Sequence, residues 1–277
     1  MSDLSNELSV TLETIREAGR KVMELYASFE RIEDAPADIS TDADRASQEL
    51  ILQRLHAAFP GDQLCGEEST PTLEQASADG SRLWIVDPID GTRGFARKND
   101  EFSIMIGLVD EGAVVLGAVY EPAIDRVTYA AKGKGCWTAQ PFDGEPVACR
   151  VRPTASLDEA VLSMSRSQGT LGEKEMLRVF GASSAIQTYS AGIKFAQVAR
   201  GESDIYVGDY LTLKDWDICA GHVLVEEAGG LVTTLGGEPV RYDGGGKSLQ
   251  GRGIVGTNGR LHGSTLAVLA TGDVPVR

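Results

Sequence analysis

The stretch WIVDPIDGTRGF, residues 84–95, is the most informative part of this sequence. We expect an apolar strand to end at Asp87, and Pro88 restricts the backbone of the turn that follows. Gly91 permits an unusual backbone conformation or a close approach of another segment, and Thr92 can open a helix. The sequence therefore predicts a strand, a turn and a helix start that bring carboxylates and backbone amides together.

Asp87 and Asp90 supply the hard oxygen ligands that Mg²⁺ prefers, and amide hydrogens at a helix start attract phosphate. An ordinary acidic connection between a strand and a helix is the alternative, and this stretch alone does not separate the two. Further acids stand at similar ends of predicted elements: Glu67 and Glu68 in CGEES, and Asp217 in KDWDICAGHVLVEEAGG. Burying several carboxylates together is prohibitive unless cations neutralise them, although Asp217 alone could equally be a helix N-cap.

The composition bounds the class of protein. The chain has 277 residues, is 42% apolar, and carries 26 Lys and Arg against 41 Asp and Glu, a formal net charge of -15. This length and apolar content predict a folded protein with a real core. The negative charge argues against a nucleic-acid polymer or a membrane surface as partner. The N-terminal stretch lacks the pattern of a signal peptide, so we expect a cytoplasmic protein.

The cysteines and histidines show no spacing typical of a metal site. An intracellular chain of this length has little need of disulfides, so we interpret the four cysteines as small buried thiols. The residues concerned are Cys65, Cys136, Cys149, Cys219, His56, His222 and His262.

The first half of the chain predicts two helices and an antiparallel sheet. Apolar residues recur at helical spacing over residues 8–26, and a second helix follows the capping residues 40–42 and stops at Pro60. Residues 31–44 form a polar loop or a hairpin. The strands expected are 63–66, 82–86, 102–109, 113–120, 126–131 and 136–139.

Helices and strands alternate in the second half, so we divide the chain into an α+β part, residues 1–148, and an α/β part, residues 149–277. The helices expected are 173–180, 191–200, 217–228 and one after Leu261, and the strands are 204–207, 231–234 and 253–256. GGGKS, residues 244–248, lacks the earlier glycine of a phosphate-binding P-loop, which favours a flexible surface loop.

Three blocks occur in a fixed order: GEES, WIVDPIDGTRGF, and WDICAGHVLVEEAGG, the last after SAGIKFAQVARGESDIY. With these blocks the chain resembles the Mg²⁺-dependent, lithium-sensitive phosphatases of the inositol monophosphatase superfamily. Its pattern is most similar to that of the 3'(2'),5'-bisphosphate nucleotidases. The resemblance implies the layered αβαβα sugar-phosphatase fold, with the site between an N-terminal antiparallel-sheet part and a C-terminal α/β part.

The resemblance also implies a ligand set for two or three Mg²⁺ ions. One ion is expected on Glu67, Asp87 and the carbonyl of Ile89, and a second on Asp87, Asp90 and Asp217. Asp87 bridges the two ions.

The same resemblance implies that the amides of Gly91 and Thr92 receive the phosphate. It also implies that an Asp before the second helix acts with Thr92 to activate water, a role that Asp44 fills better than its rival Asp42. Covalent routes lack their motifs, since the chain has no Cys-x5-Arg and no Arg-His-Gly. Two metal ions and a water nucleophile are a recognised solution to this slow hydrolysis.

Substrate choice depends on cations outside the metal motifs. Arg93 and Lys194 resemble the nucleotidase pattern and could meet a second phosphate, with Arg166 as a further contact. Alternatively, Arg93 is a solvated helix residue and Lys194 extends its stem along apolar surface. The leading interpretation is a phosphatase that converts 3'-phosphoadenosine 5'-phosphate to AMP.

An inositol-1-monophosphatase or other sugar phosphatase is the first alternative. A catalytically silent metal- or phosphate-binding regulator is the second. The expected partner is a small phosphomonoester substrate. The sequence does not decide whether the protein forms a homodimer.

Overall fold

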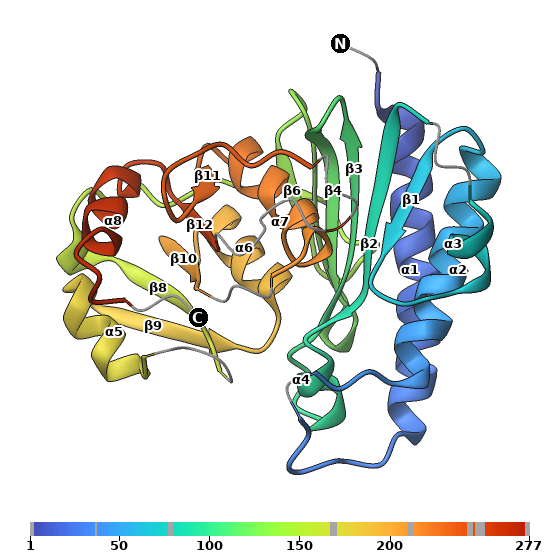
Figure 1. Ribbon diagram of the computed structural model, residues 1–277, viewed down its shortest axis with the longest axis horizontal. Helices are drawn as coiled ribbons and strands as arrows, with labels where there is room; N and C mark the ends of the chain where they lie inside the picture. The colour runs from blue at the N-terminus through green and yellow to red at the C-terminus, as the bar shows by residue number, and fades with distance from the viewer. Residues whose placement is uncertain are drawn as a thin grey trace.

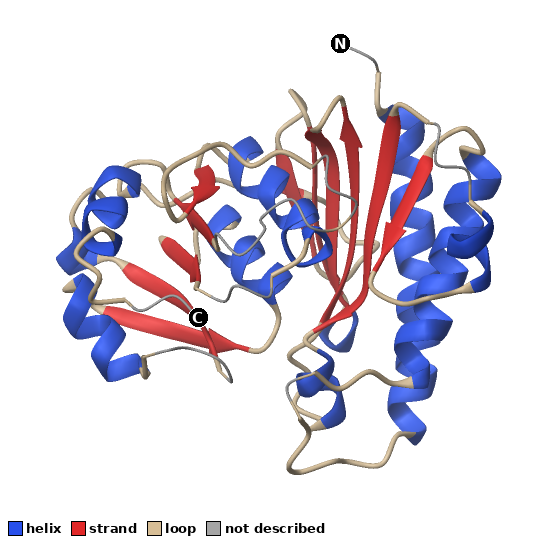
Figure 2. Ribbon diagram, viewed as in Figure 1, coloured by secondary structure: helices blue, strands red, loops and turns tan. Residues whose placement is uncertain are grey.

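The computed structural model describes residues 3–36, 38–76, 80–166, 171–209, 213–242, 246 and 253–274. Within these residues the chain forms two β-sheets (Figures 1 and 2). The first has the order β1-β2-β3-β4-β5-β6-β7, and all its neighbours are antiparallel except β1 and β2. Its strands are β1 (Gln63–Gly66), β2 (Arg82–Asp90), β3 (Ser103–Asp110), β4 (Ala113–Glu121), β5 (Arg126–Ala131), β6 (Cys136–Ala139) and β7 (Val147–Ala148).

The second sheet is mixed and has the order β11-β12-β10-β8-β9. Its strands are β8 (Val161–Ser165), β9 (Ser184–Thr188), β10 (Ile205–Gly208), β11 (Leu231–Thr234) and β12 (Ile254–Thr257). The expected division of the chain at residues 148 and 149 falls between β7 and β8. That each part is a separate domain stays a prediction.

Helices form three layers around the two sheets (Figure 1). The outer face of the first sheet is covered by α1 (Ser5–Ser28) and α2 (Asp42–Ala58), and α6 (Ala191–Ala199) and α7 (Asp215–Glu227) lie between the sheets. On the far side, α5 (Glu173–Phe180) and α8 (His262–Leu269) cover the second sheet. The short helices are α3 (Pro71–Gln75) and α4 (Thr92–Ala96). This arrangement confirms the layered fold. No described helix has the length and apolar character needed to cross a membrane.

Apolar spacing explains the two long helices. In α1 the residues Ile15, Ala18 and Val22 are fully buried against the first sheet, as their i+3/i+4 spacing predicts. In α2, Thr41 caps the first turn and Asp44 bonds back to the Thr41 amide, a capping box that fixes where the helix starts.

Two glycines let α7 lie directly on the first sheet. A Cβ atom at Gly117 would lie 2.5 Å from the Ala220 carbonyl oxygen, and one at Gly107 would lie 2.6 Å from Cys219 Sγ. Larger residues at these positions would push the helix away. The close contact sets the position of the α7 N-terminus, which carries Asp217.

Several boundaries differ from the prediction. The strand expected over residues 82–86 continues to Asp90, because Asp90 still pairs with Ser103 after a register shift. Pro88 lies inside this irregular stretch, where a missing amide hydrogen is tolerated. Helix α7 begins at Asp215, so Asp217 is not its N-cap. In the described part of residues 31–44 no hairpin forms.

Strands β7, β8 and β9 and helix α3 were not predicted. Short buried strands in a parallel arrangement lack the alternation of polar and apolar residues that marks a half-exposed strand. The sequence VLSMS of β8, whose three central residues are buried, is of this kind. Strand β9, with the sequence SAIQT, lies at the edge of the sheet and is mostly half-buried.

Candidate active site

A cleft of about 510 Å³ lies where β2, α4, α6 and α7 meet. It is lined by most of the site residues expected from the sequence, which are brought together from segments far apart in the chain. These lining residues are Glu67, Asp87, Ile89, Asp90, Gly91, Thr92, Arg93, Lys194 and Asp217.

Two groups of carboxylates border this cleft. Asp87, Asp90 and Asp217 each offer an oxygen within 4.8 Å of the other two, and Asp44, Glu67 and Glu68 do the same. Glu67 belongs to the second of these groups, and its expected sharing of an ion with Asp87 stays a prediction. After burial, the charge of Glu67 is the largest cause that raises the pKa of Asp87, so the two groups lie close together.

The raised pKa values of these acids show that burial and mutual repulsion disfavour their charged forms. Burial, followed by repulsion from Asp217 and Asp44, raises the pKa of Glu67 to about 8. Burial is also the main cause that raises the pKa of Asp217 to about 7 and lifts that of Asp87 well above its ordinary value. Bound cations would remove this repulsion. Because every expected metal ligand is a carboxylate or carbonyl oxygen, these residues fit a hard divalent cation such as Mg²⁺.

Asp90 is held by the N-terminus of α6. The amides of Ala191 and Gly192 donate to its two oxygens at 3.0 and 2.6 Å, and the Ser190 hydroxyl donates as well. Free amide hydrogens and the helix dipole favour a negative charge at this place. Sequence reasoning missed this contact. Ser190 before an apolar helix marks the cap, but nothing in the pattern shows which acid lies there.

Thr92 and Asp44 are in contact. The Thr92 hydroxyl oxygen lies 3.0 Å from Asp44 Oδ1 and 2.9 Å from the Ile89 carbonyl oxygen. Asp44 is buried, whereas Asp42 is exposed and pairs with Arg45. The structure thus places Asp44, and not Asp42, beside Thr92.

Gly91 makes the turn between β2 and α4 possible. Its φ is +87°, and a Cβ atom would lie 2.9 Å from the Glu101 carbonyl oxygen. In the part of the chain that the structure describes, no protein acceptor takes the amide hydrogens of Gly91 and Thr92. These hydrogens are therefore available to an anion in the cleft.

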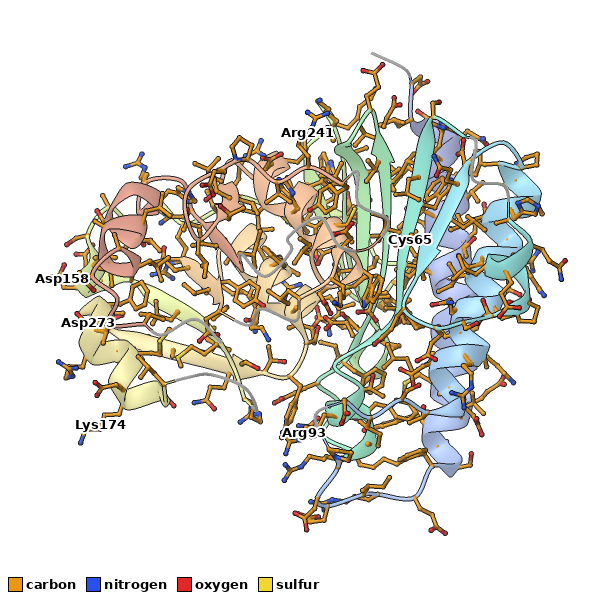
Figure 3. The ribbon with its side chains drawn as sticks, in the orientation of Figure 1. Cys65, Arg93, Asp158, Lys174, Arg241 and Asp273 are labelled. Carbon is orange, nitrogen blue, oxygen red and sulfur yellow. The ribbon has the colours of Figure 1, made fainter. Side chains whose placement is uncertain are left out.

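The three cations expected to contact substrate differ in their surroundings. Arg93 projects from α4 (Figure 3), and its buried Nε has no acceptor among the described residues. Lys194 is 1% exposed, its Nζ donates to the Tyr189 carbonyl at 3.2 Å, and burial lowers its pKa to about 8. Arg166 is not among the residues that line the cleft, and its guanidinium is paired with Glu101 through bonds of 2.8 and 2.5 Å.

Some lining residues were not singled out from the sequence. They include Tyr189 and Leu213. Lys214 and Trp216, whose segment KDWD resembles the nucleotidase pattern, also line the cleft, and Lys214 adds a further cation to its wall. The stretch KDWD shows Lys214 and Trp216 beside Asp217, but their place in the wall depends on how α7 packs.

The fold and the carboxylate groups define the class: the protein is a metal-dependent phosphoric monoester hydrolase. The sequence profile described as the inositol monophosphatase family matches residues 3–272, and the chain belongs to this family.

Curated relatives at similar identity carry different names. The fructose-1,6-bisphosphatase/inositol-1-monophosphatase of Thermotoga maritima is 31% identical over 95% of this chain and 96% of its own. The Mycobacterium tuberculosis histidinol-phosphatase is 34% identical over 84% and 85% of the two chains. The 3'(2'),5'-bisphosphate nucleotidase CysQ of Escherichia coli is 33% identical over 82% and 90%.

Solved structures agree with this assignment. The Thermotoga maritima IMPase has a TM-score of 0.79 at 30% identity and covers 96% of this chain and 97% of its own. The extragenic suppressor protein SuhB of Bartonella henselae has a TM-score of 0.80 at 27% identity, with 97% and 100% covered.

Proposed function

We propose that this protein is a Mg²⁺-dependent 3'(2'),5'-bisphosphate nucleotidase that converts 3'-phosphoadenosine 5'-phosphate to AMP and phosphate. The observation that carries the proposal is the Arg93 guanidinium, which lines the cleft directly after the Gly91-Thr92 turn and whose buried Nε has no acceptor among the described residues. A buried donor without an acceptor is costly unless a ligand satisfies it. An anionic group of the substrate would do so.

The acids bordering the cleft would hold the ions as the resemblance implies. Glu67, Asp87 and the Ile89 carbonyl would bind one Mg²⁺, and Asp87, Asp90 and Asp217 a second, with a third ion allowed by the Asp44, Glu67 and Glu68 group. When bound, such ions neutralise phosphate charge and make water more acidic. Inhibition by Li⁺ belongs to the same proposal.

Asp44 and Thr92 would take the proton from the attacking water. The Thr92 hydroxyl donates to Asp44 Oδ1. The Thr92 oxygen is then free to accept a hydrogen from water. Burial raises the pKa of Asp44, and a base of raised pKa accepts a proton more readily. The amides of Gly91 and Thr92 would hold the phosphate during this step.

Arg93 and Lys194 would bind the second phosphate. Both line the cleft, and Lys194 keeps its ammonium group among carbonyl oxygens rather than in an ion pair. The chain has a net charge of -15, and within its described part neither cation pairs with a carboxylate. Two such cations beside the cleft favour a doubly phosphorylated substrate. Hydrolysis of a by-product of sulfate assimilation would be the corresponding cellular role.

A substrate panel tests the proposal, because relatives of 31% to 34% identity carry different substrate names. We would measure kcat/KM with Mg²⁺ for 3'-phosphoadenosine 5'-phosphate, inositol 1-phosphate, fructose 1,6-bisphosphate and histidinol phosphate. The bisphosphate nucleotide should have the highest value. A higher value for any of the other three would replace this substrate assignment while leaving the phosphatase class in place.

A further inference from the structure

Asp215, the first residue of α7, is fully buried and takes no part in the chemistry described above. Its amide donates to the Gly246 carbonyl at 3.2 Å, and its Oδ2 accepts the Gly246 amide hydrogen at 3.1 Å. These two reciprocal bonds join the start of α7 to a residue 31 positions later in the chain. We call this pair of bonds the α7 latch.

Gly246 fits its place only as glycine. Its φ is +95°, and a Cβ atom there would lie 2.7 Å from Cζ3 of Trp216 and 3.4 Å from Cys65 Sγ. The backbone of Gly246 therefore packs against the Trp216 ring. Gly246 is buried, so the interpretation of GGGKS as a flexible surface loop is wrong at this residue. The other four residues of that motif lie outside the described residues.

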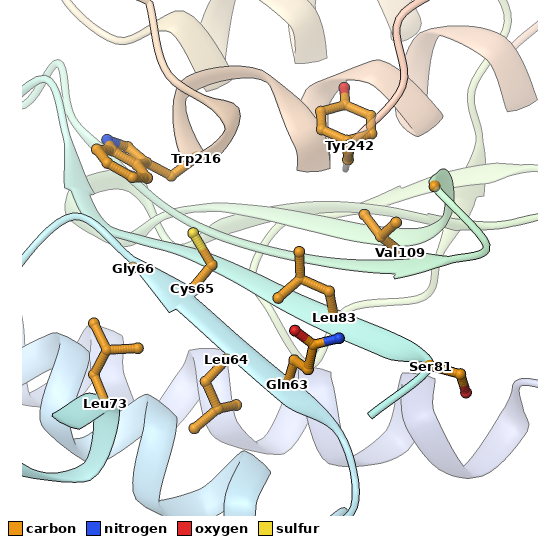
Figure 4. Close-up of a pocket in the computed structure, with 11 residues that line it drawn as sticks. Gln63, Leu64, Cys65, Gly66, Leu73, Ser81, Leu83, Val109, Trp216 and Tyr242 are labelled. Carbon is orange, nitrogen blue, oxygen red and sulfur yellow. The ribbon is translucent and has the colours of Figure 1, made fainter. Parts of the chain in front are cut away.

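Trp216, against which Gly246 packs, lines two cavities. One is the cleft with the acidic groups, and the other, of about 520 Å³, is lined by Cys65, Trp216 and Tyr242 (Figure 4). In Figure 4 the Cys65 thiol points toward the helix that carries Trp216. Gly246 thus holds the Trp216 ring from one side, and the indole forms part of the wall of the cleft.

The next residue after Trp216 is Asp217, which the latch also affects. Asp217 Oδ2 accepts the Lys214 amide hydrogen at 2.5 Å, so residues 214–217 form one hydrogen-bonded first turn. A helix terminus leaves its first amides without helical partners and would otherwise fray. Asp215 is bonded to Gly246, and Gly246 lies beside Cys65 of β1, the strand that pairs with β2. The two bonds therefore link this turn to the sheet that carries Asp87 and Asp90.

We propose that Asp215 is a positioning residue, which through the α7 latch holds Asp217 and Trp216 in the geometry that divalent-cation binding requires. The inference rests on the proposed role of Asp217 as a metal ligand. Mg²⁺ needs nearly ideal octahedral geometry, so a small displacement of one ligand weakens binding.

Metal binding without substrate tests the latch. Titration calorimetry would give the Kd for Mg²⁺ of the unaltered protein, Asp215→Ala, Asp215→Asn and Gly246→Ala. Asp215→Ala removes the acceptor, and loss of such a supporting contact should raise Kd about tenfold. Asp215→Asn keeps an oxygen acceptor and should stay within about twofold. Normal affinity in Asp215→Asn would show that the hydrogen bond to Gly246 matters and that the negative charge of Asp215 does not. Equal losses of Mg²⁺ affinity in Asp215→Ala and Asp215→Asn would overturn the proposal.

Gly246→Ala is a second test of the latch, and it replaces Asp215→Ala if that variant does not fold. Its Cβ should push Trp216 aside and raise Kd about tenfold. The matched control is Gly181→Ala, because Gly181 also has a positive φ (+65°) but a Cβ there has open space around it. An unchanged Kd in Gly246→Ala, or an equal loss in Gly181→Ala, would overturn the proposal.

Asp217→Asn separates the latch from the function on which it rests. If Asp217→Asn loses affinity while the Asp215→Ala and Gly246→Ala variants keep it, the latch proposal alone is wrong. If Asp217→Asn keeps normal affinity, the assignment of Asp217 as a ligand is wrong.

Discussion

The Thr92 hydroxyl oxygen lies 3.0 Å from Asp44 Oδ1, although the two residues are 48 positions apart. Two local structures create this contact. The capping box of α2 holds Asp44 against Thr41, with bonds of 2.8 and 2.7 Å to one oxygen, and leaves the other oxygen to face Thr92. The left-handed Gly91 places Thr92 at the start of α4. The carboxylate is thus oriented before any substrate binds.

Changes to this pair should act as one unit. If Asp44 and Thr92 share one proton path, Asp44→Asn and Thr92→Ala should each lower kcat by roughly a hundredfold to ten-thousandfold. The double variant should lose little more kcat than either single variant. Steady-state kinetics at saturating Mg²⁺ measures this, and independent, multiplicative losses would contradict a shared path.

The contact between Asp90 and α6 predicts the effect of Ser190→Ala. This change removes a hydroxyl donor from Asp90 and the cap bond to the Ile193 amide. Loss of a hydrogen bond to a charged group is worth about 1.5 to 3 kcal/mol, so kcat/KM should fall roughly ten- to a hundredfold. Loss of the cap should also cost about 1 kcal/mol of stability. Exposed Ser184→Ala is the control, and normal turnover in Ser190→Ala would show that the amides alone hold Asp90.

The pKa values predict how metal-free protein responds to pH. Folding raises the pKa of Glu67 from 4.5 to about 8 and that of Asp217 from 3.8 to about 7. At a pH between the unfolded and folded pKa values of these two acids, the folded protein binds more protons than the unfolded chain. Its free energy of unfolding therefore falls as pH rises through this window. Thermal unfolding in EDTA should therefore give a lower Tm at pH 8 than at pH 6. Equal or rising Tm over this range would show that other groups dominate.

Mg²⁺ should oppose this loss of stability. At a concentration a hundred times its Kd, a bound ion stabilises the folded state by about 2.7 kcal/mol, or roughly 5 to 10 °C in Tm. The gain should be larger at pH 8, because at pH 6 the ion must displace protons from the carboxylates. Scanning calorimetry with and without Mg²⁺ measures both values, and turnover should stop in EDTA. Full activity in EDTA would contradict the metal proposal.

Arg93 and Lys194 should affect a bisphosphate more than a monophosphate. Arg93→Ala and Lys194→Met should lower kcat/KM for 3'-phosphoadenosine 5'-phosphate by roughly ten- to a hundredfold and leave inositol 1-phosphate nearly unchanged. Methionine is chosen at position 194 because it fills the buried space that alanine would leave empty. Arg97→Ala, in the same short segment but outside the cleft lining, is the control. Equal losses on both substrates would place these cations at the common phosphate or in the support of the fold.

Patterns local in the chain allowed much of the fold to be predicted. The stripe of α1, the meander from β3 to β6 and the buried cysteines follow from apolar spacing, turn residues and length, all of which act over a few positions. The three motif blocks indicated the family in the same way, since each block is a continuous segment whose residue types reflect local chemistry.

The site needed the tertiary structure, because its contacts join residues that no local pattern relates. Asp90 meets Ala191 across 101 positions, and Asp44 rather than Asp42 faces Thr92 because of the way α2 packs beside β2. Burial of Lys194 likewise depends on the Tyr189 carbonyl and the Tyr206 ring, and burial of Gly246 depends on Trp216 and Cys65. Residue type sets which bonds a side chain can form, but packing of the whole chain sets which partner is within reach, and the energy that favours one packing is shared among many distant residues.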